Sequence, residues 1–262
     1  MNVADNINTL ADFCGKRDVK ELTTETLYDK YGFNQADVMV LFGGSILCGG
    51  DVLADAIRND VAKKYIIVGG AGHTTQTLRD KMHEAYPQLE TEDLSEAELF
   101  DDYLQYKYSL KADYIETKST NCGNNITFLL DLLKEKGIEC NSIILSQDAT
   151  MQHRMEAGLR KYRPDMTIIN FATYKVRVVE DAGKLCFDSA AWGMWDIDRY
   201  ITLLMGEIPR LTDDENGYGP EGKDYIAHVD VPQNVMEAFE ELKQSYGDFV
   251  REANPEFASA DR

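Results

Sequence analysis

Short apolar runs alternate with longer amphipathic stretches through the middle of the chain. Five of these runs are predicted strands, at residues 38–42, 65–68, 113–116, 142–145 and 167–171. Helical patterns of about 10–15 residues follow most of them, which is typical of βαβ units that build a parallel sheet. The pattern therefore predicts a Rossmann-like, doubly wound α/β fold with a mainly parallel sheet and extra N- and C-terminal helices.

The alternation of strands and helices divides the chain into three predicted segments. Residues 1–35 are predicted to be an N-terminal helical segment, and residues 36–189 the Rossmann-like α/β core. Residues 190–262 are predicted to form a C-terminal helical extension packed on the core. Within it, we expect helices near residues 196–205 and 232–246, with a loop rich in Gly, Asp and Pro from Glu207 onward.

The amino-acid composition of the chain limits the classes of molecule that it is expected to bind. The chain has 46 acidic and 27 basic residues, a formal charge of −19. Such an excess of negative charge disfavours binding to nucleic acid or to an anionic membrane surface. No apolar run approaches the roughly 18 residues of a spanning helix, and the first ten residues do not form a secretory signal. A cytoplasmic protein that does not insert into membranes is expected.

The five cysteines are widely scattered, and no two of them form a CxxC pair. This spacing suggests neither a disulfide framework nor a zinc site, so no metal centre is predicted. Free thiols in a reducing cytoplasm are the expectation. The oligomeric state stays open.

Candidate chemistry lies in the loops that follow the predicted strands. Ligands of open parallel sheets bind beyond the carboxyl ends of the strands, where glycines let the backbone approach them closely. Four glycines are candidate ligand contacts: Gly43 and Gly44 after the first strand, and Gly70 and Gly72 after the second. His73 adds a candidate hydrogen-bond donor or general base. The alternatives are a tight turn without a ligand and a solvated histidine.

Two further loops offer polar side chains. After the third strand, Thr120, Asn121 and Asn125 are candidates to hydrogen-bond a ligand, although a helix N-cap explains part of this cluster equally well. Gln147 and Thr150 follow the fourth strand and are candidates of the same kind, with capping as the alternative for Thr150.

Arg154 falls about one turn into the helix after the fourth strand. The helix dipole favours anions rather than cations near this end. A ligand carboxylate or phosphate would explain an arginine there, and so would a neighbouring protein carboxylate.

Three residues are candidates for acid or base catalysis: Glu96, His73 and Asp148. For Glu96, within Ser95-Glu96-Ala97-Glu98, a first-turn or capping-box role is the default expectation. The chain has no GxxxxGK[ST] loop, no GxSxG elbow and no HExxH pair, which removes several common enzyme classes.

These loops resemble those of the bacterial YdcF/SanA domain-of-unknown-function family, and most of all its soluble YdcF-like branch. The segments that carry the resemblance are residues 69–75, 119–125 and 147–154, with further agreement at 199–200, 206–211, 213–214, 217–220 and 228–230. The resemblance spans about residues 36–245. It implies a Rossmann-like fold and a ligand at the strand ends, with S-adenosylmethionine the compound most often associated with this branch.

The chain departs from the family pattern at two places. Asn124 stands where the family's Ser-Thr-Asn motif usually continues with glutamate one residue before Asn125. Met151 lies near the position of a histidine in the membrane-anchored branch.

Three functions follow as hypotheses. The first is a protein that binds a nucleotide-like small molecule at the strand-end loops. S-adenosylmethionine is the leading candidate for this molecule, and no reaction is assigned. The second is a hydrolase or transferase acting on a phosphorylated or cell-envelope precursor. The third is a regulatory module without catalysis, whose acidic C-terminal loop meets a protein partner.

Overall fold

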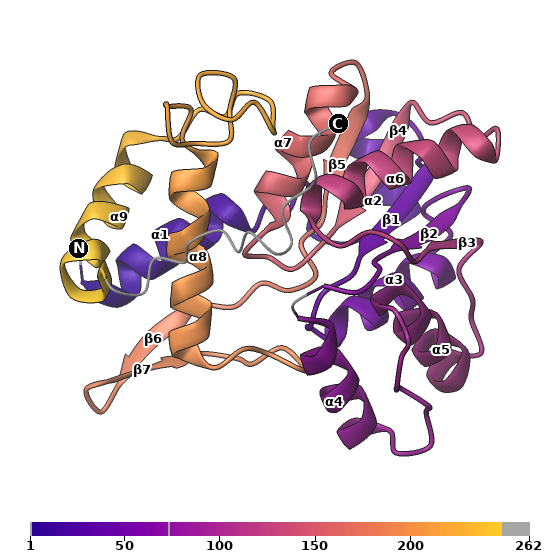
Figure 1. The fold of residues 1–262 in the computed structure, drawn as a ribbon, viewed down its shortest axis with the longest axis horizontal. Coiled ribbons are helices and arrows are strands. Elements are labelled where there is room, and N and C mark those ends of the chain that lie inside the picture. Colours follow the sequence, from indigo (N-terminus) through magenta and orange to yellow (C-terminus); the bar gives the residue numbers. More distant parts are fainter. Residues whose placement is uncertain (1, 73, 248–262) are drawn as a thin grey trace.

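A five-stranded parallel sheet forms the centre of the computed structural model, which describes residues 2–72 and 74–247 (Figure 1). The strand order is β3-β2-β1-β4-β5. The strands are β1 (Val38–Phe42), β2 (Tyr65–Val68), β3 (Tyr114–Glu116), β4 (Ser142–Ser146) and β5 (Thr167–Asn170). This sheet, with helices on both faces, confirms the predicted α/β class.

Helices fill the connections between these strands and both ends of the chain. The first five are α1 (Val3–Cys14), α2 (Thr24–Tyr31), α3 (Cys48–Arg58), α4 (Thr75–Ala85) and α5 (Glu96–Tyr108). The others are α6 (Cys122–Glu135), α7 (Gln152–Tyr162), α8 (Ile197–Leu211) and α9 (Gln233–Tyr246).

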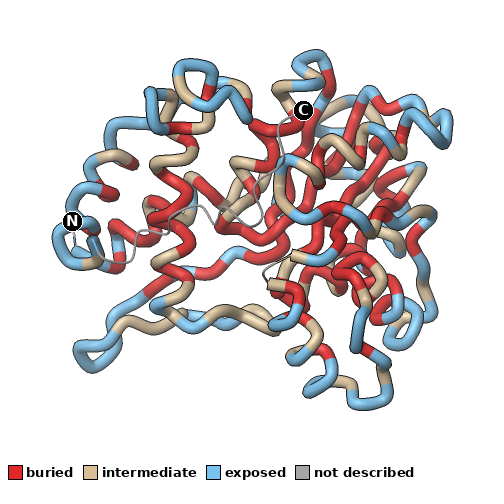
Figure 2. Tube along the Cα trace, in the orientation of Figure 1, coloured by how far each residue is buried: buried red, intermediate tan, exposed pale blue. Residues whose placement is uncertain are grey.

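Alternate residues of each central strand face different helices, because side chains of a strand alternate between the two faces of its sheet. In β1, Met39 and Leu41 pack in one cluster with residues of α3 and α5. Val38 and Val40 pack in another cluster with residues of α6 and α7. β1, β2 and β4 are buried on both sides, as Figure 2 shows, and this is why they read as continuous apolar runs in the sequence, whereas the edge strand β3 is partly exposed.

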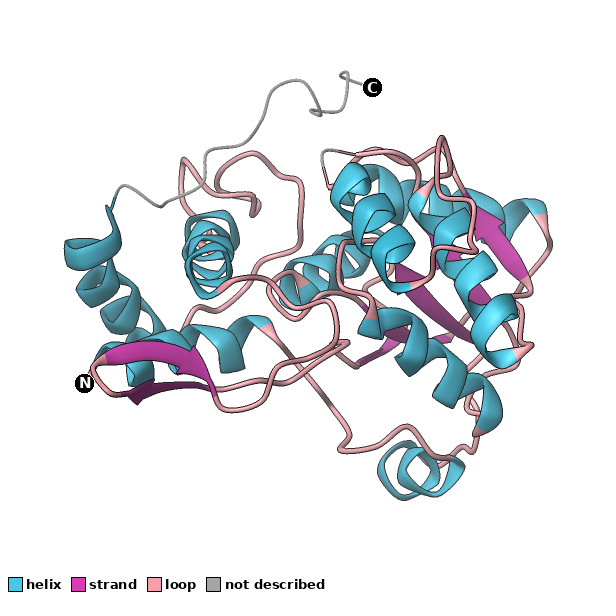
Figure 3. Ribbon diagram, turned by 90° about the horizontal axis from the view of Figure 1, so that it is seen from below, coloured by secondary structure: helices cyan, strands magenta, loops and turns pink. Residues whose placement is uncertain are grey.

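A third apolar cluster lies beside the sheet and joins the two ends of the chain. It contains Ile7 and Leu10 of α1, Ile208 of α8 and Leu242 of α9. Figure 3 shows these helices and a two-stranded hairpin, β6 (Val178–Asp181) with β7 (Lys184–Phe187), grouped at one side of the sheet. The three-segment division of the chain stays a prediction.

One local feature was not predicted, and one local prediction is wrong. The hairpin was not expected, although its turn residues Ala182 and Gly183 both have positive φ, as in the tight turns that match hairpin twist. The loop expected from Glu207 begins later, because α8 continues through Pro209 to Leu211. Burial of Ile208 and Leu211 stabilises this last turn despite the hydrogen bond that proline removes.

Candidate functional site

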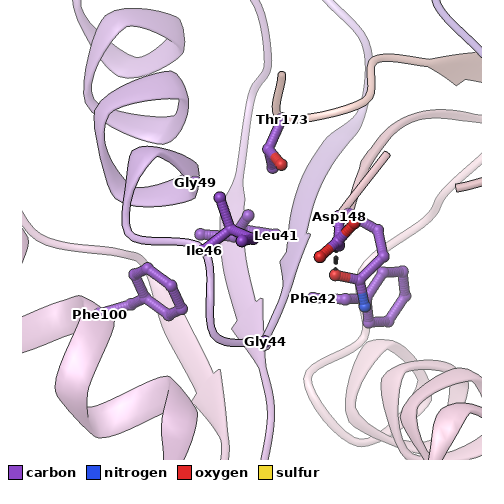
Figure 4. A pocket seen from close by; sticks show the side chains of 9 residues that line it. Leu41, Phe42, Gly44, Ile46, Gly49, Phe100, Asp148 and Thr173 are labelled. Atoms are coloured by element: carbon purple, nitrogen blue, oxygen red, sulfur yellow. Dashed lines mark hydrogen bonds between the residues drawn. The ribbon is translucent and has the colours of Figure 1, made fainter. Parts of the chain in front are cut away.

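A small cleft opens between the loops that follow β1 and β4. The chain order reverses here, because β2 and β3 lie on one side of β1 while β4 and β5 lie on the other. Such a switch point is where open α/β sheets bind ligands. The space between protein atoms in the cleft is about 190 Å³ when open solvent is included, and its interior has room for about one water molecule (Figure 4). Its lining residues are Leu41, Phe42, Gly44, Ile46, Gly49, Phe100, Gln147, Asp148 and Thr173.

Thr173 brings an unsatisfied hydroxyl group to this cleft. Its side-chain oxygen is buried and has no hydrogen-bond partner among the described residues, and Figure 4 shows the side chain directed into the space above Leu41. Buried polar atoms are nearly always paired, because an unpaired one costs about 1–3 kcal/mol. An unpaired hydroxyl that lines a cleft is therefore suited to a ligand that supplies the missing partner.

Asp148 supplies a buried carboxylate to the same cleft. Its Oδ1 accepts hydrogen bonds from the backbone N–H of Thr150 (2.9 Å), the Thr150 hydroxyl (2.9 Å) and the Tyr174 hydroxyl (2.6 Å). Its Oδ2 accepts one from Trp195 Nε1 at 2.8 Å. Three donors thus hold Oδ1, while Oδ2 has a single protein donor and more capacity to accept from a ligand.

Gln147 ties together the two loops that bound the cleft. Its Nε2 donates to the carbonyl of Gly43 (3.1 Å), and its Oε1 accepts from the backbone of Asp148 (2.6 Å). A Cβ atom added at Gly44 would meet only Gln147 Oε1, at 3.4 Å, which is an ordinary contact. Of the predicted contacts, Gly44 and Gln147 line the cleft, together with the candidate catalytic residue Asp148.

Glu96 lies next to the cleft, beneath the loops after β1 and β2. Its Oε1 accepts hydrogen bonds from the hydroxyls of Thr75 (2.9 Å) and Thr74 (3.3 Å). Burial raises the pKa of Glu96 above its usual range, and the two hydroxyl bonds oppose part of that rise. The expected capping box is also present, but Ser95 and Glu98 form it. Glu96 is therefore not part of the capping box. Its side chain packs against the loops at the carboxyl ends of β1 and β2.

Two of the predicted ligand-binding glycines approach the protein itself. A Cβ atom at Gly43 would lie 2.4 Å from Glu96 Oε2, and one at Gly70 would lie 2.2 Å from the carbonyl oxygen of Ser119. Both positions need glycine because loops pack together there. A glycine that packs against the protein and a glycine that contacts a ligand look the same in sequence, because both directly follow a strand.

The loop after β3 caps α6 rather than lining the cleft. Asn121 is the N-cap, and its side chain accepts from the backbone of Asn124 at 3.0 Å. Thr120 donates to Asn124 Oδ1 (3.1 Å), and Asn125 lies buried in the first helical turn. Asn121 therefore holds the capping role that was the alternative to ligand binding.

The remaining loop candidate after β2 is also used within the protein. Gly72 N–H donates to Thr75 Oγ1 at 2.7 Å. His73, the other candidate in this loop, lies outside the described residues.

Arg154 has a protein carboxylate as its partner. Its guanidinium forms a bidentate pair with Glu207 of α8, with Nε–Oε2 and Nη2–Oε1 distances of 2.5 Å and 2.9 Å. The two side chains are only 13% and 7% exposed. Of the two explanations that the sequence left open for Arg154, the structure favours the neighbouring carboxylate over a ligand. The Arg154 side chain therefore joins α7 to α8.

The described part of the chain offers neither a metal centre nor a membrane-spanning helix. Within residues 2–72 and 74–247, no cluster of three or more His, Cys, Asp or Glu side chains is placed to hold a metal ion. No helix in that part of the chain is both long and apolar enough to cross a membrane.

Comparison with known proteins identifies no family, since no protein-family model matches the chain. One similar solved structure is a crystal structure of E. coli tRNA N6-threonylcarbamoyladenosine dehydratase, TcdA, at 11% identity and a TM-score of 0.33. The match covers 93% of this chain and 96% of that one. A structure described as TcdA (CsdL) matches at 10% identity and a TM-score of 0.32, covering 93% and 91%. Scores this low support no inference about function.

Proposed function

We propose that this chain binds a small nucleotide-like molecule at the switch-point cleft. The observation that carries the proposal is the orphan hydroxyl of Thr173, buried in a cleft that also holds a carboxylate oxygen of Asp148. The floor is apolar, with Leu41 and Phe100 among its residues. An apolar cleft with a few convergent polar groups is the usual form of a small-molecule site.

Neighbouring helix ends add to this chemistry. The residues before α3, α4 and α7 make no side-chain capping hydrogen bond, and all three helices begin at the carboxyl edge of the sheet. Helix N-termini carry free N–H groups and a partial positive charge that favour anions. A ligand with both a polar, hydrogen-bonding part and an anionic group suits this edge.

S-adenosylmethionine is the first compound we propose for the cleft, on the strength of the family resemblance. The residues fit its polar end, because Thr173 and Asp148 offer a hydroxyl and a carboxylate for its ammonium group. The interior of the cleft has room for about one water molecule in this structure. Binding would therefore require the loops around the cleft to move apart, and the adenosyl part would extend outside it. When bound, the compound would supply a transferable methyl group.

A thermal-shift panel tests the proposal. The compounds are S-adenosylmethionine, S-adenosylhomocysteine, ATP, NAD and a phosphosugar. A ligand at 100 times its dissociation constant adds about 2.7 kcal/mol, which raises the melting temperature of a chain this long by roughly 5–10 °C. A response to the adenosyl compounds supports S-adenosylmethionine, and a response to another compound replaces it. A flat panel contradicts ligand binding of this class.

A variant pair locates the bound compound. Gly44→Leu places a side chain in the cleft, so we expect it to abolish the shift. Gly247→Leu is the matched control, because nothing lies within 4 Å of a Cβ atom at that position. An unchanged shift in a folded Gly44→Leu protein would place the ligand elsewhere.

A second candidate function is a hydrolase or transferase acting on a phosphorylated or cell-envelope precursor. The observation that favours it is Glu96, a buried acid whose pKa is raised by burial, which favours the protonated form that a general acid needs. The test compares turnover of such substrates by the wild-type protein and by Glu96→Gln. The melting temperature of the variant is measured as well, to show that it folds. Lost turnover in a folded variant supports this function, and full turnover contradicts it.

A further inference from the structure

Lys81 of α4 is a partly buried cation that contacts two backbone carbonyls and an aromatic ring. Its Nζ donates to the carbonyl of Gly193 at 2.7 Å and lies 3.4 Å from that of Ser45. The ammonium also lies 4.9 Å from the centre of the Trp195 ring. Among the residues that the structure describes, no carboxylate lies within the 4.0 Å of an ion pair with Lys81.

This ammonium group lies at the rim of the cleft. Ser45, whose carbonyl it approaches, stands between the lining residues Gly44 and Ile46. Trp195, whose ring it faces, donates a hydrogen bond to the lining residue Asp148. Lys81 therefore contacts neighbours of the cleft on two sides, in the loop after β1 and in the segment that precedes α8.

That segment, residues 190–195, crosses from the hairpin to the strand ends and is called the crossing segment here. In Figure 1 the chain between β7 and α8 reaches toward α4. The Trp192 carbonyl accepts from the backbone of Cys48 at 3.2 Å. Gly193, at φ +76°, lies so close to Leu47 that an added Cβ atom would be 2.8 Å from its backbone nitrogen. The crossing segment thus covers the start of α3, at the edge of the cleft.

The charge of Lys81 is poorly compensated for its degree of burial. Burial lowers the pKa of Lys81, and the charges of Asp148 and Asp196 only oppose this effect. A charged donor forms stronger hydrogen bonds with an anion than with a neutral carbonyl. An anionic group at the cleft would supply the missing compensation in a chain that otherwise has an excess of acids.

We propose that Lys81 is the anion-binding residue of the cleft, where its ammonium exchanges the carbonyl of Gly193 for a phosphate or carboxylate of the ligand. This inference rests on the proposed function, since it requires a ligand in the cleft. It assigns the ligand an acidic group next to the part that meets Thr173 and Asp148. The exchange loosens the contact between Lys81 and the crossing segment.

Paired compounds that differ in one acidic group test the inference. AMP against adenosine probes a phosphate, and S-adenosylmethionine against its decarboxylated form probes the amino-acid carboxylate. Dissociation constants are measured by calorimetry for the wild-type chain and for Lys81→Met. We expect Lys81→Met to weaken binding of the acidic member of the responding pair at least tenfold and to leave the member without the acidic group within twofold.

Two variants control for charge and for folding. Lys134→Met removes an exposed lysine of α6 and should leave every constant unchanged. Lys81→Arg keeps the charge and should keep most of the preference for the acidic member. If Lys81→Met does not fold, as judged by its melting temperature, Lys81→Gln replaces it in the same titrations.

Tryptophan fluorescence adds a local readout. The chain has two tryptophans, and both lie in the crossing segment, so Trp192→Phe leaves Trp195 as the single emitter. We expect the acidic compound to shift the emission of this protein and Lys81→Met to remove the shift.

The outcomes separate the two proposals. No binding of any compound to the wild-type chain overturns the proposed function and Lys81 with it. If the wild-type chain binds a compound and Lys81→Met keeps the same preference for the acidic member of the pair, the role of Lys81 is overturned and the proposed function stands.

Discussion

At the scale of single residues, Thr173 makes the most direct prediction about stability. Thr173→Val replaces the orphan hydroxyl with a methyl group of the same shape, so no hydrogen bond is lost in the unliganded protein. We expect the free energy of unfolding to stay the same or to rise by up to about 1 kcal/mol. Denaturation in urea, without ligand, measures this change.

Thr150→Val is the matched control for that measurement. The Thr150 hydroxyl donates to Asp148 Oδ1 at 2.9 Å, so its loss should lower the free energy of unfolding by about 1–2 kcal/mol. If Thr173→Val destabilised the chain as much as Thr150→Val, the Thr173 hydroxyl would have a partner within the protein.

Glu96 makes a prediction about pH. Burial raises its pKa in the folded protein above the ordinary value of 4.5, so folding favours the protonated form. The stability that this group contributes is fully present below the unfolded pKa and is lost as pH rises through the folded pKa. Glu96→Gln stays neutral, so we expect its melting temperature relative to wild type to be higher at pH 8 than at pH 4.

The glutamine amide can also change the melting temperature by an amount that does not depend on pH. Comparing the two pH values cancels that amount. Glu98→Gln is a useful control, because hydrogen bonds from Ser95 lower the pKa of Glu98 and its effect should have the opposite sign. A difference for Glu96→Gln that did not change between pH 4 and pH 8 would contradict a raised pKa.

At the scale of elements, the Arg154–Glu207 pair joins α7 to α8 through a buried contact. Removing one partner leaves a buried charge without compensation, which typically costs about 3–5 kcal/mol. We expect Arg154→Met and Glu207→Met each to lower the free energy of unfolding by that amount. The double variant should lose much less than the sum of the two.

Urea denaturation of the four proteins completes this double-mutant cycle. Additive single effects would mean that the pair contributes no coupling and that Arg154 is free to serve another role. The cycle therefore also decides between the protein carboxylate and a ligand as the partner of Arg154.

Element by element, the sheet was predictable and its surroundings only in part. The strands lie within one residue of their predicted bounds. For β1, β2 and β4 the reason is burial on both faces, which leaves an unbroken apolar run. The hairpin escaped prediction because it is short and largely exposed beyond Val178. The last turn of α8 depends on burial of Leu211 against distant residues, which no local pattern around Pro209 reveals.

The location of the candidate site in the fold could be predicted from the sequence, but only some of its residues could. The rule that ligands bind at strand ends led to Gly44, Gln147 and Asp148. It did not lead to Thr173, which follows the fifth strand, where the same rule applies. Local sequence also does not distinguish a glycine that approaches a ligand from Gly70, which approaches Ser119.

At the scale of the whole molecule, the cleft is shared between distant parts of the chain. The sheet supplies its floor, α5 supplies Phe100 to its lining, and the segment before α8 reaches its rim through Trp195. The helices at both ends of the chain pack together beside the sheet and hold that segment in place. Long-range packing of this kind has no signature in a local motif.

The central claim is that the cleft at Thr173 and Asp148 holds the ligand. Calorimetric titration of the strongest compound from the panel into wild-type protein and into Thr173→Val tests it most directly. We predict about tenfold weaker binding to Thr173→Val, which corresponds to about 1.4 kcal/mol, with its stability intact. Equal affinity in the two proteins would contradict the account, because the hydroxyl on which it depends would not meet the ligand.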